Sequence, residues 1–134
     1  MKKLTYIFDS FAVIAYLQAE PGGQEVRELL KKSDAGKISV LMSAINLGEI
    51  IYIIERKLGR SIADSILHDI FELPVQLVES TMPRVLSAAH IKARYAISYA
   101  DAFVVALSHE KKGIIVTADP EFKQVESLVD ILWL

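Results

Sequence analysis

The chain has 134 residues, of which 52% are hydrophobic, and its formal net charge is -2. It contains no cysteine, which excludes disulfides, thiolate catalysis and cysteine-bound zinc. No stretch reaches the ~20 apolar residues of a membrane helix, and the start of the chain lacks the apolar core of a signal peptide. We therefore expect one soluble, cytoplasmic domain over residues 1–134, without membrane contact and without overall attraction to nucleic acid.

The first half of the chain predicts two strands and four helices. Short apolar runs favour strands, amphipathic periodicity favours helices, and glycine or proline marks where they end. Ser43 is a plausible N-cap for the long third helix, which Gly59 ends. The expected elements are a strand over 4–8, helices over 11–19 and 24–35, a strand over 37–42, and helices over 44–58 and 61–72.

The second half continues the alternation of strands and helices. The helix over 99–111 is apolar on most sides and should pack deep within the domain. Short apolar strands separated by helices indicate a parallel sheet covered on both faces, so the predicted class is α/β. The expected elements are a strand over 75–78, helices over 83–94 and 99–111, a strand over 114–117, a helical turn from Pro120, and a strand over 129–133.

Four acidic residues lie at or near junctions between expected strands and helices. Asp9 closes the first strand and Asp119 follows the fourth. Glu49 lies among apolar residues in the helix after the second strand, and Asp101 opens the apolar helix. Strand C-termini of a parallel sheet share one edge, so all four can face one cleft. Because a carboxylate in apolar surroundings is costly unless paired, protonated or bound to a cation, the pattern predicts a divalent-metal site.

The predicted site suits magnesium or manganese, which prefer hard oxygen ligands and keep several waters. Phosphodiester hydrolysis is the chemistry that such a site favours, and it requires no side-chain nucleophile. The sequence has no glycine-rich phosphate loop, Walker motif or Gly-x-Ser-x-Gly elbow, which argues against nucleotide cofactors and serine hydrolysis.

Polar neighbours support this arrangement. Asn46 shares a helical face with Glu49, where it can bind substrate or orient the carboxylate. We expect three hydroxyl groups to hold the neighbouring carboxylates in place. They belong to Ser10, Ser98 and Thr117.

Each acid also has a purely structural explanation. Asp9 and Asp119 suit N-caps, and Asp101 complements a helix dipole; taken singly, these explanations are the better ones. Glu49 is harder to explain in this way, although an ion pair with Arg56 remains an alternative. The joint placement at one sheet edge favours the functional interpretation.

Four segments in order along nearly the whole chain carry a resemblance to a known family. They are Phe8-Asp9-Ser10 and residues 43–49, 98–102 and 117–122. Through them the chain resembles the PIN-domain ribonucleases, and specifically the VapC-type toxins of prokaryotic toxin–antitoxin pairs.

This resemblance implies a three-layer α/β/α sandwich around a central parallel sheet of four to five strands. It implies cleavage of RNA that depends on Mg²⁺ or Mn²⁺, with Asp9, Glu49, Asp101 and Asp119 as metal ligands. It also implies a homodimer and a cognate antitoxin whose C-terminal arm lies across the active cleft.

Three alternatives to the toxin remain open. The first is a PIN-like nuclease that processes RNA without being a toxin. The second is a catalytically silent binding module whose acidic cleft holds a basic partner peptide. The third, an aspartyl-phosphate phosphatase, is disfavoured because it requires a second aspartate two residues after Asp9, where the chain has Phe11.

Overall fold

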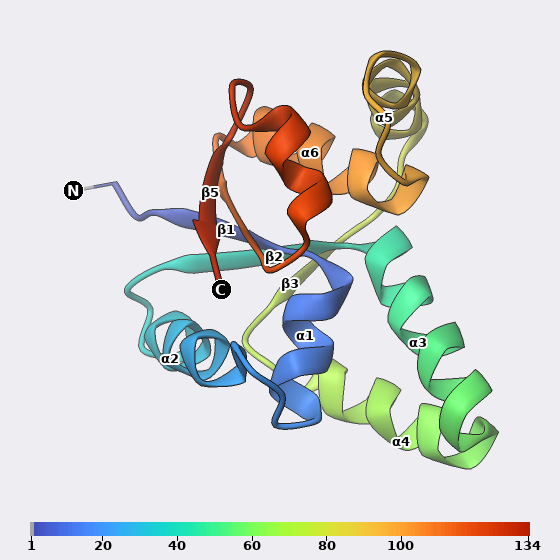
Figure 1. The fold of residues 1–134 in the computed structure, drawn as a ribbon. Coiled ribbons are helices and arrows are strands. Elements are labelled where there is room, and N and C mark those ends of the chain that lie inside the picture. Colours follow the sequence, from blue (N-terminus) through green and yellow to red (C-terminus); the bar gives the residue numbers. More distant parts are fainter. Residues whose placement is uncertain (1) are drawn as a thin grey trace.

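The computed structural model describes residues 2–134 and contains a sheet of five parallel strands (Figure 1). Their spatial order is β3-β2-β1-β4-β5, and every neighbouring pair is parallel. The strands are β1 (Thr5–Phe8), β2 (Ser39–Ser43), β3 (Gln76–Val78), β4 (Ile114–Thr117) and β5 (Asp130–Trp133). The predicted α/β class and parallel sheet are confirmed.

The helices form the two outer layers. They are α1 (Ser10–Leu17), α2 (Gly23–Asp34), α3 (Ala44–Leu58), α4 (Arg60–Phe71), α5 (Met82–Arg94), α6 (Tyr99–Lys111) and the 3-10 helix η1 (Pro120–Val125). Helices α1 to α4 lie on one side of the sheet, and α5, α6 and η1 lie on the other (Figure 1). The three-layer arrangement implied by the resemblance is therefore confirmed.

Alternation along the strands supplies a hydrophobic core to each face. In β1, Phe8 belongs to the core beneath α1 to α4, whereas Ile7 belongs to the core beneath α5 and α6. Ile7 pairs with Leu41 on β2 and Ile115 on β4, and both belong to the same core as Ile7. Strands buried on both faces explain why these runs read as continuously apolar.

The element boundaries agree with the expected ones within two residues. Two of them shift by two residues: α1 ends at Leu17 rather than at Ala19, and β2 begins at Ser39 rather than at Lys37. The late start of β2 is explained by the end of α2, where Gly36 adopts a positive φ of 75° and the Lys37 N–H donates to the Lys32 carbonyl. This hydrogen bond is typical of a helix C-terminus, so Lys37 still belongs to the end of the helix.

Two pairings place the residues of interest at one edge of the sheet. Phe8 pairs with Val116, so the residues that follow β1 and β4 lie beside each other at the C-terminal edge. The apolar helix α6 packs against both strands and against β2, as its composition predicted. Within residues 2–134, no helix has the length and apolar character needed to cross a membrane.

Candidate metal centre

Asp9 is buried at the end of β1 and is 1% exposed. Its Oδ1 accepts a hydrogen bond of 2.8 Å from the Ala12 N–H, so it does cap α1. Its Oδ2 accepts one of 2.5 Å from the Thr117 hydroxyl. Burial raises the pKa of Asp9 from 3.8 to about 6; these two hydrogen bonds oppose the shift, and nearby Asp119 and Glu49 add to it.

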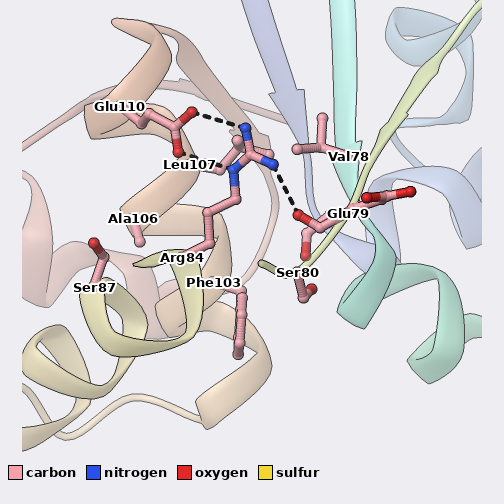
Figure 2. Close-up of a pocket in the computed structure, with 10 residues that line it drawn as sticks. Val78, Glu79, Ser80, Arg84, Ser87, Phe103, Ala106, Leu107 and Glu110 are labelled. Atoms are coloured by element: carbon pink, nitrogen blue, oxygen red, sulfur yellow. Dashed lines mark hydrogen bonds and ion pairs between the residues drawn. The ribbon is translucent and has the colours of Figure 1, made fainter. Parts of the chain in front are cut away.

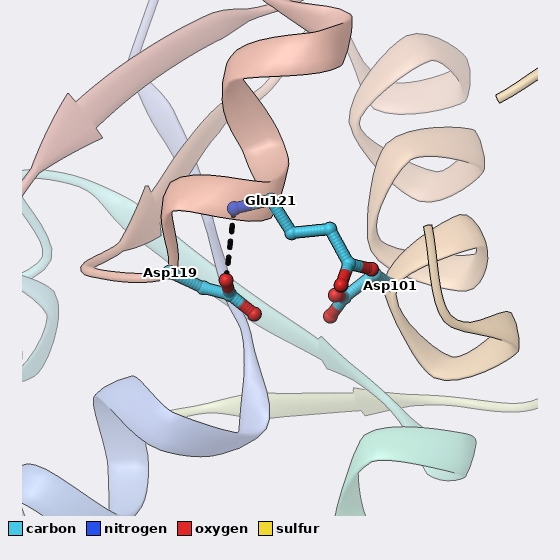
Figure 3. A group of neighbouring side chains, drawn as sticks. All are labelled: Asp101, Asp119 and Glu121. Carbon is cyan, nitrogen blue, oxygen red and sulfur yellow. Dashed lines mark hydrogen bonds between the residues drawn. The ribbon is translucent and has the colours of Figure 1, made fainter. Parts of the chain in front are cut away.

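Three carboxylates converge at the N-terminus of α6 (Figure 3). Asp101, Asp119 and Glu121 each offer an oxygen within 4.8 Å of the other two. Asp119 caps η1, because its Oδ1 accepts a hydrogen bond of 2.9 Å from the Glu121 N–H. The side chain of Glu121 extends from η1 back toward Asp101 (Figure 3), and its Oε1 accepts a hydrogen bond of 2.5 Å from the Ser98 N–H.

The charge of this cluster is not neutralised by the protein. Asp101 is 6% exposed, and its pKa rises from 3.8 to about 8, first because of burial and then because of the charges of Asp119 and Asp9. In the part of the chain that the structure describes, the acids in ion pairs are Glu28, Asp64 and Glu110. A bound cation would relieve the mutual repulsion of the cluster and favour its ionised form.

Glu49 lies at the side of this group rather than inside it. It is half-buried on α3 and close enough to Asp9 to raise its pKa, but it is not one of the three converging carboxylates. The alternative ion pair with Arg56 is wrong, because the ion pairs within residues 2–134 include neither Glu49 nor Arg56. The guanidinium of Arg56 instead lies over the ring of Tyr52, 5.0 Å from its centroid.

Ser10 contacts Asn46 instead of a carboxylate, contrary to expectation. The Asn46 amide donates to the Ser10 hydroxyl at 3.1 Å, and that hydroxyl donates to the Asn46 backbone carbonyl at 3.2 Å. Both residues are buried, and the pair joins the first turns of α1 and α3. The first turn of α3 precedes Glu49, so the pair fixes the helix that carries Glu49 against the helix that follows Asp9. The Oδ1 of Asn46 is buried without a hydrogen-bond partner.

Ser98 and Thr117 both contact the acid-bearing segments. The Ser98 hydroxyl accepts a hydrogen bond of 3.1 Å from the Asp101 N–H and so caps α6. Thr117 binds Asp9 and also accepts a hydrogen bond of 3.0 Å from the Asp119 N–H.

Glu121 belongs to the group of converging carboxylates, although the sequence pattern did not predict it as a site residue. It follows the Asp119-Pro120 pair that opens η1, a position where an acidic residue commonly complements a helix dipole. Its contact with Ser98 depends on how the loop before α6 folds, and the sequence gives no sign of that contact. An acid two residues after a predicted ligand was the one available signal.

A separate cavity lies between β3, α5 and α6 and has room for about one water molecule (Figure 2). Arg84 at its wall donates to both carboxylate oxygens of Glu110 at 3.0 Å and to the Glu79 carbonyl at 3.0 Å. Its charge is thus already matched, so this cavity offers no free cation to an anionic ligand.

Comparison with known proteins agrees with the fold. Residues 6–128 match the family model described as "PIN domain". A search of curated protein sequences found no match.

Solved structures with the same fold include toxin–antitoxin complexes. The structure of VapBC2 from Rickettsia felis bound to a promoter DNA fragment has a TM-score of 0.73 at 16% identity, covering 96% of this chain and 98% of that one. DNA-bound VapBC from Salmonella typhimurium has a TM-score of 0.73 at 15% identity, and the match covers 96% of this chain and 97% of that one. VapC20 of Mycobacterium tuberculosis, a sarcin-ricin loop cleaving toxin, has a TM-score of 0.64 at 20% identity, and the match covers 82% of this chain and 86% of that one. At these identities the similarity is one of fold.

Proposed function

Since this chain belongs to the PIN-domain family, we propose that it is a divalent-metal-dependent endoribonuclease and the toxin of a type II toxin–antitoxin pair. One observation carries the catalytic part of this proposal: carboxylates from α6 and η1 converge within 4.8 Å of one another beside the buried Asp9, and no cationic side chain forms an ion pair with them in residues 2–134. We further propose that residues 1–134 act as a single nuclease domain.

The residues present fit Mg²⁺ or Mn²⁺. The donors are carboxylate oxygens, which these hard cations prefer. The pKa of Asp101 is raised first by burial and then by the charges of Asp119 and Asp9, and a bound cation would offset both effects by favouring the ionised form. In the proposed site, Asp9, Glu49, Asp101 and Asp119 hold the cation, and Glu121 adds a fifth carboxylate. When bound, the cation would activate water and stabilise the charge that develops on the phosphate.

Neighbouring side chains hold these acids in position. Thr117 fixes one oxygen of Asp9 and leaves only one further lone pair on it for another partner. Ser98 caps α6 and so places Asp101 in its first turn. Ser10 and Asn46 join α1, which follows Asp9, to α3, which carries Glu49. We propose positioning roles for these four residues, since outer contacts of this kind orient metal ligands.

The catalytic proposal is tested with purified protein and single-stranded and hairpin RNAs. We expect cleavage with Mg²⁺ or Mn²⁺, loss of cleavage with a chelator, and at least a hundredfold loss in Asp9→Asn and Asp101→Asn. Undiminished cutting in both variants and with the chelator would contradict a metal-dependent site. Binding of an arginine-rich peptide without any Mn²⁺ binding would instead favour the silent binding module.

The toxin role is tested separately in cells. The similar structures from Rickettsia felis and Salmonella typhimurium are VapBC complexes, which supports a cognate antitoxin for this chain. We also propose that the chain forms a homodimer, as its resemblance to VapC-type toxins implies. We expect cytoplasmic expression of the protein to arrest the growth of the cells. Asp101→Asn should abolish this arrest, and the product of an adjacent small gene should relieve it. RNA cleavage in vitro without growth arrest would contradict the toxin role and would favour a nuclease that processes RNA.

A further inference from the structure

Lys92, in the last turn of α5, holds its ammonium against the loop that leads into α6. Its Nζ donates a hydrogen bond of 2.7 Å to the Ile97 carbonyl. The N–H of the same peptide group belongs to Ser98 and donates to Glu121 Oε1 at 2.5 Å. A single peptide group therefore separates the ammonium from a carboxylate of the cluster, so Nζ and Oε1 are at most about 8 Å apart.

The charge of Lys92 is free to act on a ligand. Lys92 is exposed, and the ion pairs formed by lysines among the described residues involve Lys31 and Lys111. An ammonium has three donors, and the Ile97 carbonyl occupies one of them. Two donors and a full positive charge thus remain at the border of the acidic cluster.

Such a cation meets a need that the acidic site creates. The formal net charge is -2, and the proposed site concentrates negative charge where an RNA strand must approach. A bound cation offsets part of this charge at the scissile phosphate, but the neighbouring phosphates also require partners. Contacts from lysine to phosphate supply affinity and register without reading sequence.

We propose that Lys92 binds a phosphate of the RNA strand next to the scissile bond and so positions the strand across the carboxylate cluster. This inference rests on the proposed ribonuclease function. Lysine suits the task as a compact point charge, and its hydrogen bond to Ile97 holds the charge at a defined place beside the site.

A structural explanation is that Lys92 only fastens the loop before α6. The chain offers a matched control for this explanation. Gln124 in η1 donates a hydrogen bond of 3.0 Å from its neutral amide to the Ala96 carbonyl, one residue before Ile97. Loss of the Gln124 side chain should loosen the same loop without removing any charge. Loss of the Lys92 side chain removes both a hydrogen bond to the loop and a positive charge.

The experiment measures RNA binding in an Asp101→Asn background, which prevents cleavage. A labelled single-stranded RNA is titrated with protein at several KCl concentrations, with Mg²⁺ held constant. We expect Lys92→Gln and Lys92→Met to weaken binding several-fold at low salt, and to reduce the slope of log K against log[salt] by about 0.7, the value for one contact to a single strand. Lys92→Arg should keep the slope of the parent, and so should Gln124→Ala. Thermal unfolding of each variant confirms that it is folded.

Each result bears on one proposal. An unchanged slope in Lys92→Gln, or an equal loss of slope in Gln124→Ala, overturns the role of Lys92, while RNA cleavage by the protein with native Asp101 leaves the proposed function intact. Absence of both RNA binding and RNA cleavage in the protein with native Asp101 overturns the ribonuclease proposal itself, and the inference with it.

Discussion

The Thr117 hydroxyl donates a hydrogen bond of 2.5 Å to Oδ2 of Asp9, although the two residues are 108 positions apart in the chain. The same hydroxyl accepts from the Asp119 N–H at 3.0 Å. One side chain at the end of β4 therefore contacts both the acid that follows β1 and the backbone of the acid that opens η1. The relative placement of Asp9 and Asp119 depends on this contact as well as on the pairing of the strands.

We predict that Thr117→Val, which keeps the shape and removes the hydroxyl, lowers the free energy of unfolding at neutral pH by about 1–3 kcal/mol, since a buried charge loses a donor. The pKa of Asp9 should rise above about 6, because this hydrogen bond opposes the effect of burial. Mn²⁺ affinity should fall about ten- to a hundredfold. Urea unfolding and calorimetric Mn²⁺ titration measure these effects. Thr117→Ser serves as the control that keeps the hydroxyl, and a valine variant equal to the parent would disprove the role.

The raised pKa values predict how the stability of the metal-free protein depends on pH. Asp9 and Asp101 bind protons in the folded state up to pH values of about 6 and about 8, whereas in the unfolded state they release them near 3.8. The folded protein thus holds more protons across this interval, so these groups make stability fall as pH rises from about 4 to about 8. For each of the two acids, the unfavourable contribution to stability is absent below pH 3.8 and complete above the pKa of that acid in the folded state.

Asp101→Asn should therefore flatten the upper part of this pH dependence. We expect the metal-free variant to be more stable than the parent at pH 8 by about 1–2 kcal/mol, which allows for solvent screening of the charges, and to differ little from it at pH 4. Urea unfolding at pH 4, 6 and 8 in the presence of a chelator gives the three values. Parallel pH profiles for variant and parent would show that ionising Asp101 in the folded protein does not destabilise it.

Much of the fold could be predicted from the sequence because its signals are local. The bounds of α3 and α6 agree with the predicted ones, since the N-cap Ser43 of α3 and the apolar character of α6 are visible in the chain. The parallel strands then place Asp9 and Thr117 at one edge by topology alone.

What the sequence could not show depends on contacts between distant loops. The contact of Glu121 with Ser98 requires the loop before α6 to lie against η1, and no local pattern encodes that arrangement. Ser10 likewise contacts Asn46, a residue 36 positions away, rather than the acid beside it. Arg56 lies over an aromatic ring one turn earlier on its own helix rather than two turns away at Glu49.

Glu121 offers a comparison between charge and geometry. Glu121→Gln keeps a carbonyl oxygen that can accept from the Ser98 N–H but loses the negative charge, whereas Glu121→Ala loses both. We predict that both variants weaken Mn²⁺ binding and that only the alanine variant also lowers the stability of the metal-free protein, by about 1 kcal/mol. Thermal unfolding with and without Mn²⁺ separates the two effects, because a ligand at a hundred times its Kd stabilises the folded state by about 2.7 kcal/mol. Mn²⁺ binding by Glu121→Gln equal to that of the parent would show that this carboxylate serves the loop alone.

Arg84 provides a test of whether the cavity beside β3 belongs to the functional site. Its guanidinium donates to Glu110 from Nε and Nη2 and to the Glu79 carbonyl from the third nitrogen, Nη1 (Figure 2), an arrangement that lysine cannot reproduce. We predict that Arg84→Lys lowers the free energy of unfolding by about 1 kcal/mol, because the ion pair is only partly buried. Metal binding and RNA cleavage should stay within twofold of the parent, since the charge of Arg84 is already matched within the fold. Urea unfolding and cleavage assays at 25 °C check both statements. A large loss of cleavage without loss of stability would place this cavity on the path of the RNA strand.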